Sequence, residues 1–217
     1  MKKISRVTRS KQKARQNYDR LSAWYDTFAK SEQKFTEKGM LAFDPHPGES
    51  LLEIGYGTGN ALIDLARAAH PVPVHGIDLS FKMGQRAQSK FAQAGGITQA
   101  RLTLGDAAQP PYPNNAFHGI FISFTLELFD TPEIPLVLAE CKRVLKKGGR
   151  ISVVALAKRE SSAVRIYEWF HEKMPVLVDC RPIHAEASLQ NAGFEITEKD
   201  EERMWGLPVS ILVAKNV

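Results

Sequence analysis

The sequence contains little cysteine. Among 217 residues only Cys141 and Cys180 carry a thiol, and their spacing matches neither a metal site nor a redox pair. A chain of this length buries about 70% of the surface that its unfolded form exposes, so it needs no disulfide or metal to stabilise its core. We therefore expect a globular protein held by hydrophobic packing in a reducing compartment, with no metal site.

The sequence also lacks a long apolar run. The longest, around 120–129, is interrupted by Ser123, Thr125 and Glu127, and it is shorter than the roughly 20 residues that cross a bilayer. The chain starts with lysines and polar residues instead of an apolar secretory segment. These features predict a cytoplasmic protein.

Acidic residues are nearly absent from the first twenty positions. Asp19 is the one acidic side chain there. This stretch is therefore more basic than the rest of the chain, because the whole chain has a net charge of only +5. The basic residues of this stretch are Lys2, Lys3, Arg6, Arg9, Lys11, Lys13, Arg15 and Arg20. We expect residues 1–13 to form a basic arm. It is either a solvated, disordered tail or a segment attracted to anionic lipid headgroups or nucleic-acid phosphates, and of these two partners we favour lipid.

Residues 14–45 are expected to form a helical cap. Their apolar side chains recur at steps of three and four residues, which places them on one face of a helix. These side chains are Ala14, Tyr18, Leu21, Tyr25 and Phe28. Gly39 and the proline-rich stretch 45–48 predict the end of this cap.

From residue 50 onward the pattern alternates between buried strands and amphipathic helices. The predicted strands are 51–54, 72–77, 101–104, 120–124 and 151–155, and the helices are 61–69, 81–94, 185–191 and one from Thr131 and Pro132 through Val144, ended by Gly148 and Gly149. Such alternation predicts a doubly wound α/β fold with a mostly parallel sheet. Two last strands, 195–204 and 209–214, are expected to form an antiparallel hairpin. We expect a single domain over 14–217, in which 156–185 lies on the substrate side.

Three glycines follow the first predicted strand in the stretch LLEIGYGTGN. Gly55, Gly57 and Gly59 are spaced two apart, whereas a dinucleotide fold uses Gly-x-Gly-x-x-Gly, and its third glycine position is occupied here by Asn60. Glu53 would repel phosphates but could orient a ligand with ammonium and sulfonium centres. The loop therefore favours S-adenosylmethionine over a dinucleotide, and the remaining alternative is a plain tight turn.

Two aspartates follow the next strands. Asp78 ends the second predicted strand, where a carboxylate can accept hydrogen bonds from ribose hydroxyls, and this serves either cofactor. Asp106 follows the third strand and could accept a hydrogen bond from an adenine amino group. Each could alternatively be a turn former without a ligand.

These motifs together resemble a known family. LLEIGYGTGN, GIDLS, GDAAQPPYPNNAFHGIFISFTLELF and VLKKGGRISVV occur in the order found in class I S-adenosylmethionine-dependent methyltransferases. Within that class, YDRLSAWYDTF and ISFTLELF are similar to the ubiquinone/menaquinone biosynthesis and phospholipid N-methyltransferases. The resemblance implies a Rossmann-like, seven-stranded sheet. It also implies cofactor contacts from Thr58, Asp78, Leu79, Asp106, Ala107 and Ser123, with Tyr18 and Tyr25 over the methionine end.

Methyl transfer from a sulfonium needs alignment more than covalent catalysis. A weakly acidic acceptor still gains from a general base. We expect Tyr25 to position the sulfonium, and His171 to be the catalytic base; the alternatives are helix packing for Tyr25 and a surface or core histidine for His171. His184 and Glu127 are further candidates for the base, and Glu127 is also interpreted as a helix-end or core-lining carboxylate.

The acceptor is expected to be small or amphiphilic. Two aromatic-rich stripes lie outside the predicted strands, and they form either core or an apolar cleft. They comprise Tyr18, Leu21, Trp24, Tyr25 and Phe28, and then Ile166, Tyr167, Trp169, Phe170 and Met174. A cleft beside a basic arm would suit a quinol or a phospholipid headgroup at a membrane surface. The alternatives are an RNA or protein methyltransferase, or a non-catalytic module that binds S-adenosylmethionine. Nucleic acid is disfavoured because 110–112 of QPPYP precede the fourth strand instead of following it.

Overall fold

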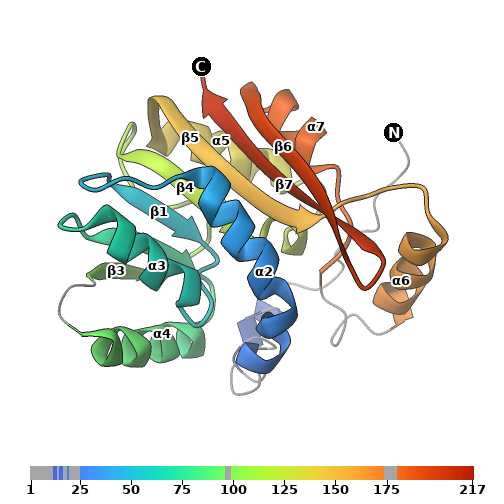
Figure 1. Cartoon of the computed structure of the whole chain (residues 1–217), viewed down its shortest axis with the longest axis horizontal. Coiled ribbons are helices and arrows are strands. Elements are labelled where there is room, and N and C mark those ends of the chain that lie inside the picture. The colour runs from blue at the N-terminus through green and yellow to red at the C-terminus, as the bar shows by residue number, and fades with distance from the viewer. Residues whose placement is uncertain (1–11, 14, 17–18, 20–24, 96–98, 174–179) are drawn as a thin grey trace.

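The sheet runs through the centre of the molecule (Figure 1). The structure is a computed structural model that describes residues 12–13, 15–16, 19, 25–95, 99–173 and 180–217. Within them, seven strands form one sheet in the order β3-β2-β1-β4-β5-β7-β6. The strands are β1 (Leu51–Ile54), β2 (Val74–Asp78), β3 (Ala100–Leu104), β4 (Phe117–Ser123), β5 (Leu145–Leu156), β6 (Phe194–Met204) and β7 (Leu207–Asn216).

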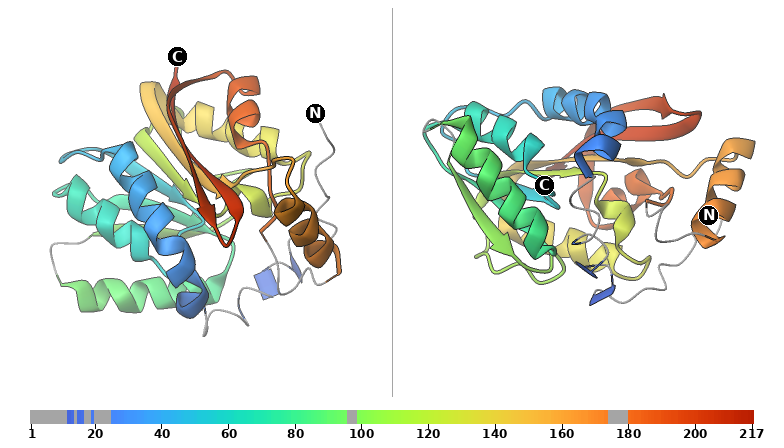
Figure 2. Two further views of the ribbon diagram at one scale, coloured as in Figure 1. Left: turned by 45° about the vertical axis from the view of Figure 1, so that its right-hand side comes forward. Right: turned by 90° about the horizontal axis from the view of Figure 1, so that it is seen from below.

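Helices cover both faces of this sheet. One face carries α2 (Tyr25–Phe43), α3 (Asn60–Ala69) and α4 (Phe81–Ala94), and the other carries α5 (Ile134–Val144) and α7 (Ala185–Asn191). A short 3₁₀ helix, η1 (Leu126–Leu128), follows β4. Beyond the end of β5, α6 (Ser162–Lys173) lies beside the tip of the β6–β7 hairpin (Figure 2). No helix among the described residues is both long and apolar enough to cross a bilayer.

The parallel strands bring their carboxyl ends to one edge of the sheet. Ile54 at the end of β1 is paired with Ile77 of β2 on one side and with Ile122 of β4 on the other. β5 pairs in parallel with β4, whereas β7 is antiparallel to both β5 and β6. The predicted doubly wound, mostly parallel sheet with a C-terminal antiparallel hairpin is therefore confirmed.

The central strands are buried on both faces, as a sheet covered by two helical layers requires. All four residues of β1 are buried. Because successive side chains of a strand point to opposite faces, Leu51 packs in a cluster with α3 residues, while Leu52 packs in a cluster with α5 residues. This double cover fixes the positions of the loops at the strand ends.

The prediction that Gly39 ends the first helix was wrong. α2 continues through this residue to Phe43 and packs across β5, β7 and β4. A side chain at position 39 would overlap the Val154 side chain of β5. The glycine therefore allows close approach of helix and sheet; it does not break the helix.

The predicted start of the helix at 131–144 was also wrong, whereas its end was correct. α5 begins at Ile134, not at Thr131, and it ends at Val144, as predicted. The Thr131 hydroxyl accepts a hydrogen bond from the Arg181 guanidinium (3.2 Å), so it does not cap the helix. Gly148 and Gly149 lie inside β5. The two glycines were interpreted as the residues that end the helix. In the structure β5 begins at Leu145, directly after α5, so no loop separates the helix from the strand.

Candidate active site

The glycine loop connects β1 to α3 in a backbone shape that suits glycine. Gly55, Gly57 and Gly59 have φ values of 74°, 51° and 86°, in the left-handed region that other residues avoid. A side chain at position 55 would also overlap Thr125, the residue before η1. The loop is held from behind by the hydrogen bond from Gly55 N to Ile77 O (2.8 Å). The glycines thus bring bare backbone to the edge where the parallel strands end.

Asp78 fixes this loop against the end of β2. Its two carboxylate oxygens accept hydrogen bonds from Gly57 N (2.9 Å) and from Ser80 N (2.8 Å). Desolvation raises the pKa of Asp78, and the backbone donors Ser80 and Gly57 oppose that rise. Leu79, next to it, is half-buried. Asp78 therefore lies beside the loop, where a ribose would have to compete with or share these donors.

Glu53 is a buried carboxyl group with one unused oxygen. Its exposed fraction is 4%, and its Oε2 accepts no hydrogen bond from any described residue. Burial raises its pKa well above 4.5, and the charges of Asp78 and Asp64 add to that rise. A buried polar atom without a partner is costly, so it is usually satisfied by a ligand or water. A positively charged ammonium or sulfonium centre of S-adenosylmethionine placed here would oppose this rise in pKa and stabilise the ionised carboxylate.

Asp106 forms a compact turn after β3. Its Oδ1 accepts a hydrogen bond from Ala108 N (3.0 Å), and the neighbouring Ala107 is buried. Gly105 N donates to Asp78 O (2.9 Å), which joins this turn to the end of β2. The structure therefore brings Asp106 and Ala107 to the same edge as the glycine loop.

Two predicted cofactor residues make hydrogen bonds to protein side chains. Thr58 Oγ1 is 2.8 Å from Lys90 Nζ of α4, which also contacts Asn60 Oδ1. Ser123 Oγ is 2.8 Å from Thr36 Oγ1 of α2. Both hydroxyls lie at the correct edge, and each also ties the loops to a helix. Their contact with cofactor stays a prediction.

The described part of the N-terminal segment reaches this edge. Asp19 Oδ1 accepts hydrogen bonds from Ser80 Oγ (2.5 Å) and from Lys82 N (3.1 Å), at the start of α4. Tyr18 lies outside the described residues. Tyr25 begins α2 and His171 lies in α6, but neither side chain is among those described. The roles of these three residues therefore stay predictions.

A second group of charges lies at the ends of β4 and β5. Glu127 in η1 is fully buried; its Oε1 accepts a hydrogen bond from Leu156 N (3.1 Å), and its Oε2 has no partner among the described residues. Burial raises its pKa to about 8, with Glu32 adding to the rise and Arg181 opposing it. Burial also raises the pKa of Glu32, on α2, to about 7. The charge of Glu32 contributes to the raised pKa of Glu127, so the two carboxyl groups are near enough to interact.

Arg181 balances this pair from the loop before α7. Its guanidinium is fully buried and donates to Phe129 O and to Thr131 Oγ1. Phe124, which follows β4 at a φ of 46°, packs edge-on against Phe35 of α2 at 6.3 Å between ring centroids. The carboxyl pair is therefore set in an apolar surrounding with one nearby cation.

Sequence reasoning missed Glu32 and Arg181 as site residues. Glu32 lies in a polar helix where its spacing predicts only exposure, and Arg181 lies in a segment without periodicity. Glu127 was considered, and its position inside the apolar stretch ISFTLELF was the available signal, because carboxylates are rarely buried without a function or a partner.

The comparisons with known proteins agree with this geometry. Residues 51–149 match the model of a family described as "Methyltransferase domain". The demethylmenaquinone methyltransferase of Symbiobacterium thermophilum is 27% identical over 84% of this chain and 80% of its own length. That of Geobacillus kaustophilus is 32% identical over 68% of this chain, which spans 61% of that relative.

Solved structures share the fold. An S-adenosylmethionine-dependent methyltransferase from Methanosarcina mazei is similar at a TM-score of 0.68 and 16% identity, over 82% of this chain and 97% of that one. The cyclase SpnF is similar at a TM-score of 0.77 and 20% identity, over 99% and 98% of the two chains.

Fold likeness alone does not assign a reaction. The methyltransferase domain match and the methyltransferase relatives do so, and the Glu53 carboxyl beside the glycine loop fits the sulfonium cofactor. Residues 51–149 therefore carry a methyltransferase domain, and the sequence relatives and the shared fold support an S-adenosylmethionine-dependent methyltransferase that resembles the class I enzymes.

Proposed function

We propose that this methyltransferase acts on a quinol-type acceptor, and that the Glu32–Glu127 pair receives the proton that the acceptor loses. The observation that carries the proposal is the buried Glu127 carboxyl, whose Oε2 has no hydrogen-bond partner among the described residues and whose pKa is raised by burial and by the charge of Glu32. The names of relatives, demethylmenaquinone methyltransferases, support the acceptor class.

The carboxyl pair is connected to the cofactor loop. Thr125, two residues before Glu127, packs directly behind Gly55. On the other side, the Thr36 hydroxyl contacts Ser123 and donates to the backbone oxygen of Glu32 (3.2 Å). These contacts support a position of the pair close to the glycine loop, on the side of β4 and β5.

The chemistry of the acceptor explains why a base is useful. A quinone is an electrophile, so it must be reduced to a quinol to attack a methyl group. S-adenosylmethionine supplies that electrophilic methyl group, whose bond to sulfur breaks with the electron pair left on sulfur. As the acceptor forms its new bond to the methyl carbon, the hydroxyl proton passes to a carboxylate. A base with a pKa of about 7 to 8 matches a weakly acidic phenol near neutral pH.

The experiment is an acceptor panel with methyl-labelled S-adenosylmethionine and the full chain. A demethylmenaquinol analogue, a simple phenol, phosphatidylethanolamine and total RNA are each supplied, and products are identified by mass spectrometry. We expect label in the naphthoquinol. Label in the phospholipid or the RNA, with none in the naphthoquinol, would refute the proposed acceptor.

A further inference from the structure

Two tryptophans and an isoleucine are exposed near the end of β5. Ile166 and Trp169 are 59% and 54% exposed on α6, and Trp205 is 77% exposed in the β6–β7 turn. The interpretation of the α6 stripe as core was wrong for Ile166 and Trp169, because α6 packs inward through Val164 and Tyr167 instead. Large apolar side chains that gather on a surface indicate an interaction site.

The conformation of Trp205 makes its exposure more informative. Met204 pairs with Leu207, so Trp205 and Gly206 form a two-residue turn with φ values of 52° and 81°. Asn, Asp and Gly are the residues that such a turn favours, and a bulky residue there is strained. The Trp205 side chain is 77% exposed, so most of the indole is available for a contact outside the chain.

The two exposed groups lie at one corner of the molecule. Val164 and Tyr167 of α6 pack in the same apolar cluster as Met204 and Leu207 of the hairpin. The Arg159–Glu201 ion pair (2.6 Å) links the residues after β5 to β6. Both views in which the hairpin tip is visible place it next to α6 (Figures 1 and 2). We name this surface the tryptophan corner; it comprises Arg165, Ile166, Trp169, Arg203 and Trp205.

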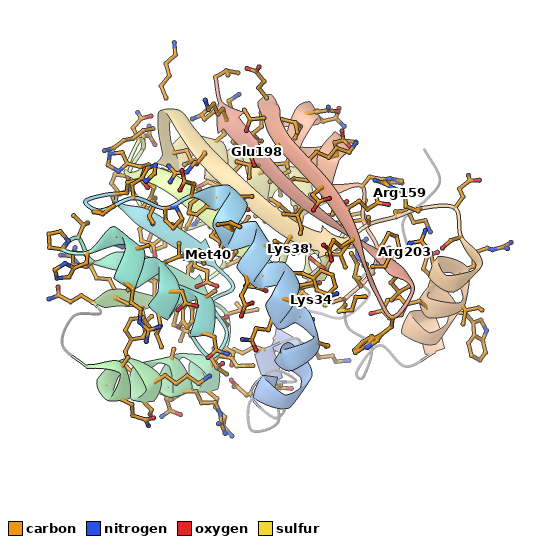
Figure 3. All side chains as sticks on the ribbon, viewed as in Figure 1. Lys34, Lys38, Met40, Arg159, Glu198 and Arg203 are labelled. Atoms are coloured by element: carbon orange, nitrogen blue, oxygen red, sulfur yellow. The ribbon has the colours of Figure 1, made fainter. Side chains whose placement is uncertain are left out.

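The tryptophan corner has a surplus of positive charge. Three nearby carboxylates are matched by cations: Glu168 by Lys158, Glu201 by Arg159, and Glu202 by Lys34 and Lys38. Arg165 and Arg203 are exposed, and neither guanidinium contacts a carboxylate within the described part of the chain. Figure 3 shows Arg203 near Arg159 on this side of the hairpin.

We propose that the tryptophan corner docks on an anionic membrane surface, with Trp169 and Trp205 in the headgroup region and Arg165 and Arg203 on anionic lipids. Tryptophan is enriched at membrane interfaces because its ring is apolar and its N–H is polar. Basic residues beside such rings add attraction to anionic lipids. An anionic bilayer therefore matches both the exposed tryptophans and the arginines of the corner.

The position of the tryptophan corner suggests how docking would serve the reaction. This step rests on the proposed amphiphilic acceptor. Leu156 ends β5 and donates its backbone N–H to Glu127, and α6 begins six residues later. The corner is therefore at the same end of β5 as the carboxyl pair. Docking there would let an acceptor with a long apolar tail enter without leaving the membrane.

The test uses the full chain and vesicles of phosphatidylcholine with phosphatidylglycerol, some carrying brominated acyl chains that quench tryptophan on contact. The variants are Trp169→Gln and Trp205→Asn, the latter chosen because Asn suits a positive φ. Leu41→Gln is the matched control, since Leu41 is 81% exposed on α2, outside the corner. We expect each tryptophan variant to weaken binding by about tenfold, and the control to bind like wild type.

The outcomes separate this proposal from its rivals and from the proposed function. Arg165→Gln with Arg203→Gln should remove the preference for anionic over neutral vesicles. Wild-type-like binding and quenching in both tryptophan variants would overturn the proposal, and so would a dimer that Trp205→Asn dissociates, because the corner would then join two copies. A short-chain, water-soluble quinol should be methylated equally by all variants. If that quinol is never methylated while vesicle binding behaves as expected, the acceptor assignment fails and the docking surface stands.

Discussion

At the scale of single residues, the ionisable carboxyl group of Glu127 is not needed for the one structural hydrogen bond that it accepts. Its Oε1 satisfies Leu156 N, a role that an amide oxygen could fill equally well, yet the carboxyl remains buried with Oε2 unpartnered. Glu127→Gln keeps the acceptor for Leu156 N and removes the ionisable group. The variant therefore separates a structural role from proton transfer.

We predict that Glu127→Gln lowers kcat by about 10²- to 10⁴-fold, the usual contribution of general acid–base catalysis. The affinity for S-adenosylmethionine should be unchanged, because Glu53 and the glycine loop are intact. Steady-state kinetics and calorimetry measure the two quantities. Glu37→Gln is the control, since Glu37 is an exposed residue of α2 that contacts Gln33. A variant at position 127 with normal kcat would show that this carboxyl is only structural.

The same side chain predicts how stability depends on pH. The pKa of Glu127 is raised from 4.5 to about 8 in the folded state. The folded state therefore holds a proton that the unfolded state releases, so the contribution to stability is complete below pH 4.5 and is lost as the pH rises through 8. We predict that Glu127→Gln raises Tm, by on the order of 5 °C, at pH 8.5 but not at pH 4.5. Thermal denaturation at the two pH values tests this, and an equal shift at both would contradict it.

At the scale of elements, the glycine loop offers a matched pair of substitutions. Gly48 and Gly55 have similar φ values, 85° and 74°, but a side chain at 48 meets nothing within 4 Å, whereas one at 55 overlaps Thr125. Gly48→Ala should cost roughly 1–2 kcal/mol of stability through its backbone alone. Gly55→Ala should cost more, and it should weaken S-adenosylmethionine binding by about tenfold or more. Equal behaviour of the two variants in calorimetry would show that the overlap is unimportant.

For a Gly39→Ala substitution in α2, helix propensity alone predicts a gain in stability, whereas the packing in the structure predicts a loss. Gly→Ala inside a helix normally stabilises it by about 1 kcal/mol. At Gly39 the added methyl group would overlap Val154, so we predict a loss of about 1–3 kcal/mol. Chemical denaturation measures the difference, with Glu37→Ala as an exposed control on the same helix. A more stable Gly39→Ala variant would mean that helix and sheet separate easily here.

Elements that the sequence predicted well share a physical cause. The strands 51–54 and 120–124 are continuous apolar runs that only a covered parallel sheet can bury, and their existence and order were correct. The predicted helix boundaries were wrong where contacts between distant parts of the chain determine where a helix begins or ends. Gly39 lies inside a helix that packs closely on Val154, and Thr131 accepts a hydrogen bond from Arg181, which lies fifty residues away, instead of capping α5.

At the scale of the whole molecule, the carboxyl ends of the parallel strands collect both halves of the site. The proposed cofactor half follows from local sequence, because Gly55, Asp78 and Asp106 each lie at the end of a strand or within two residues after it. The proposed acceptor half combines Glu32 from α2, Glu127 from η1 and Arg181 from the loop before α7. Only the folded chain brings these distant residues near enough for their charges to interact, so sequence patterns could not find them.

The direct test of the account is the pH dependence of a single turnover. The full chain is loaded with methyl-labelled S-adenosylmethionine and mixed with excess naphthoquinol between pH 6 and pH 10, and the label in the acceptor is followed with time. The account predicts a rate that rises as the carboxyl pair loses its proton, through about pH 7 to 8, and then reaches a plateau. A rate that keeps rising with the ionisation of the quinol itself, or that does not change with pH, would contradict it.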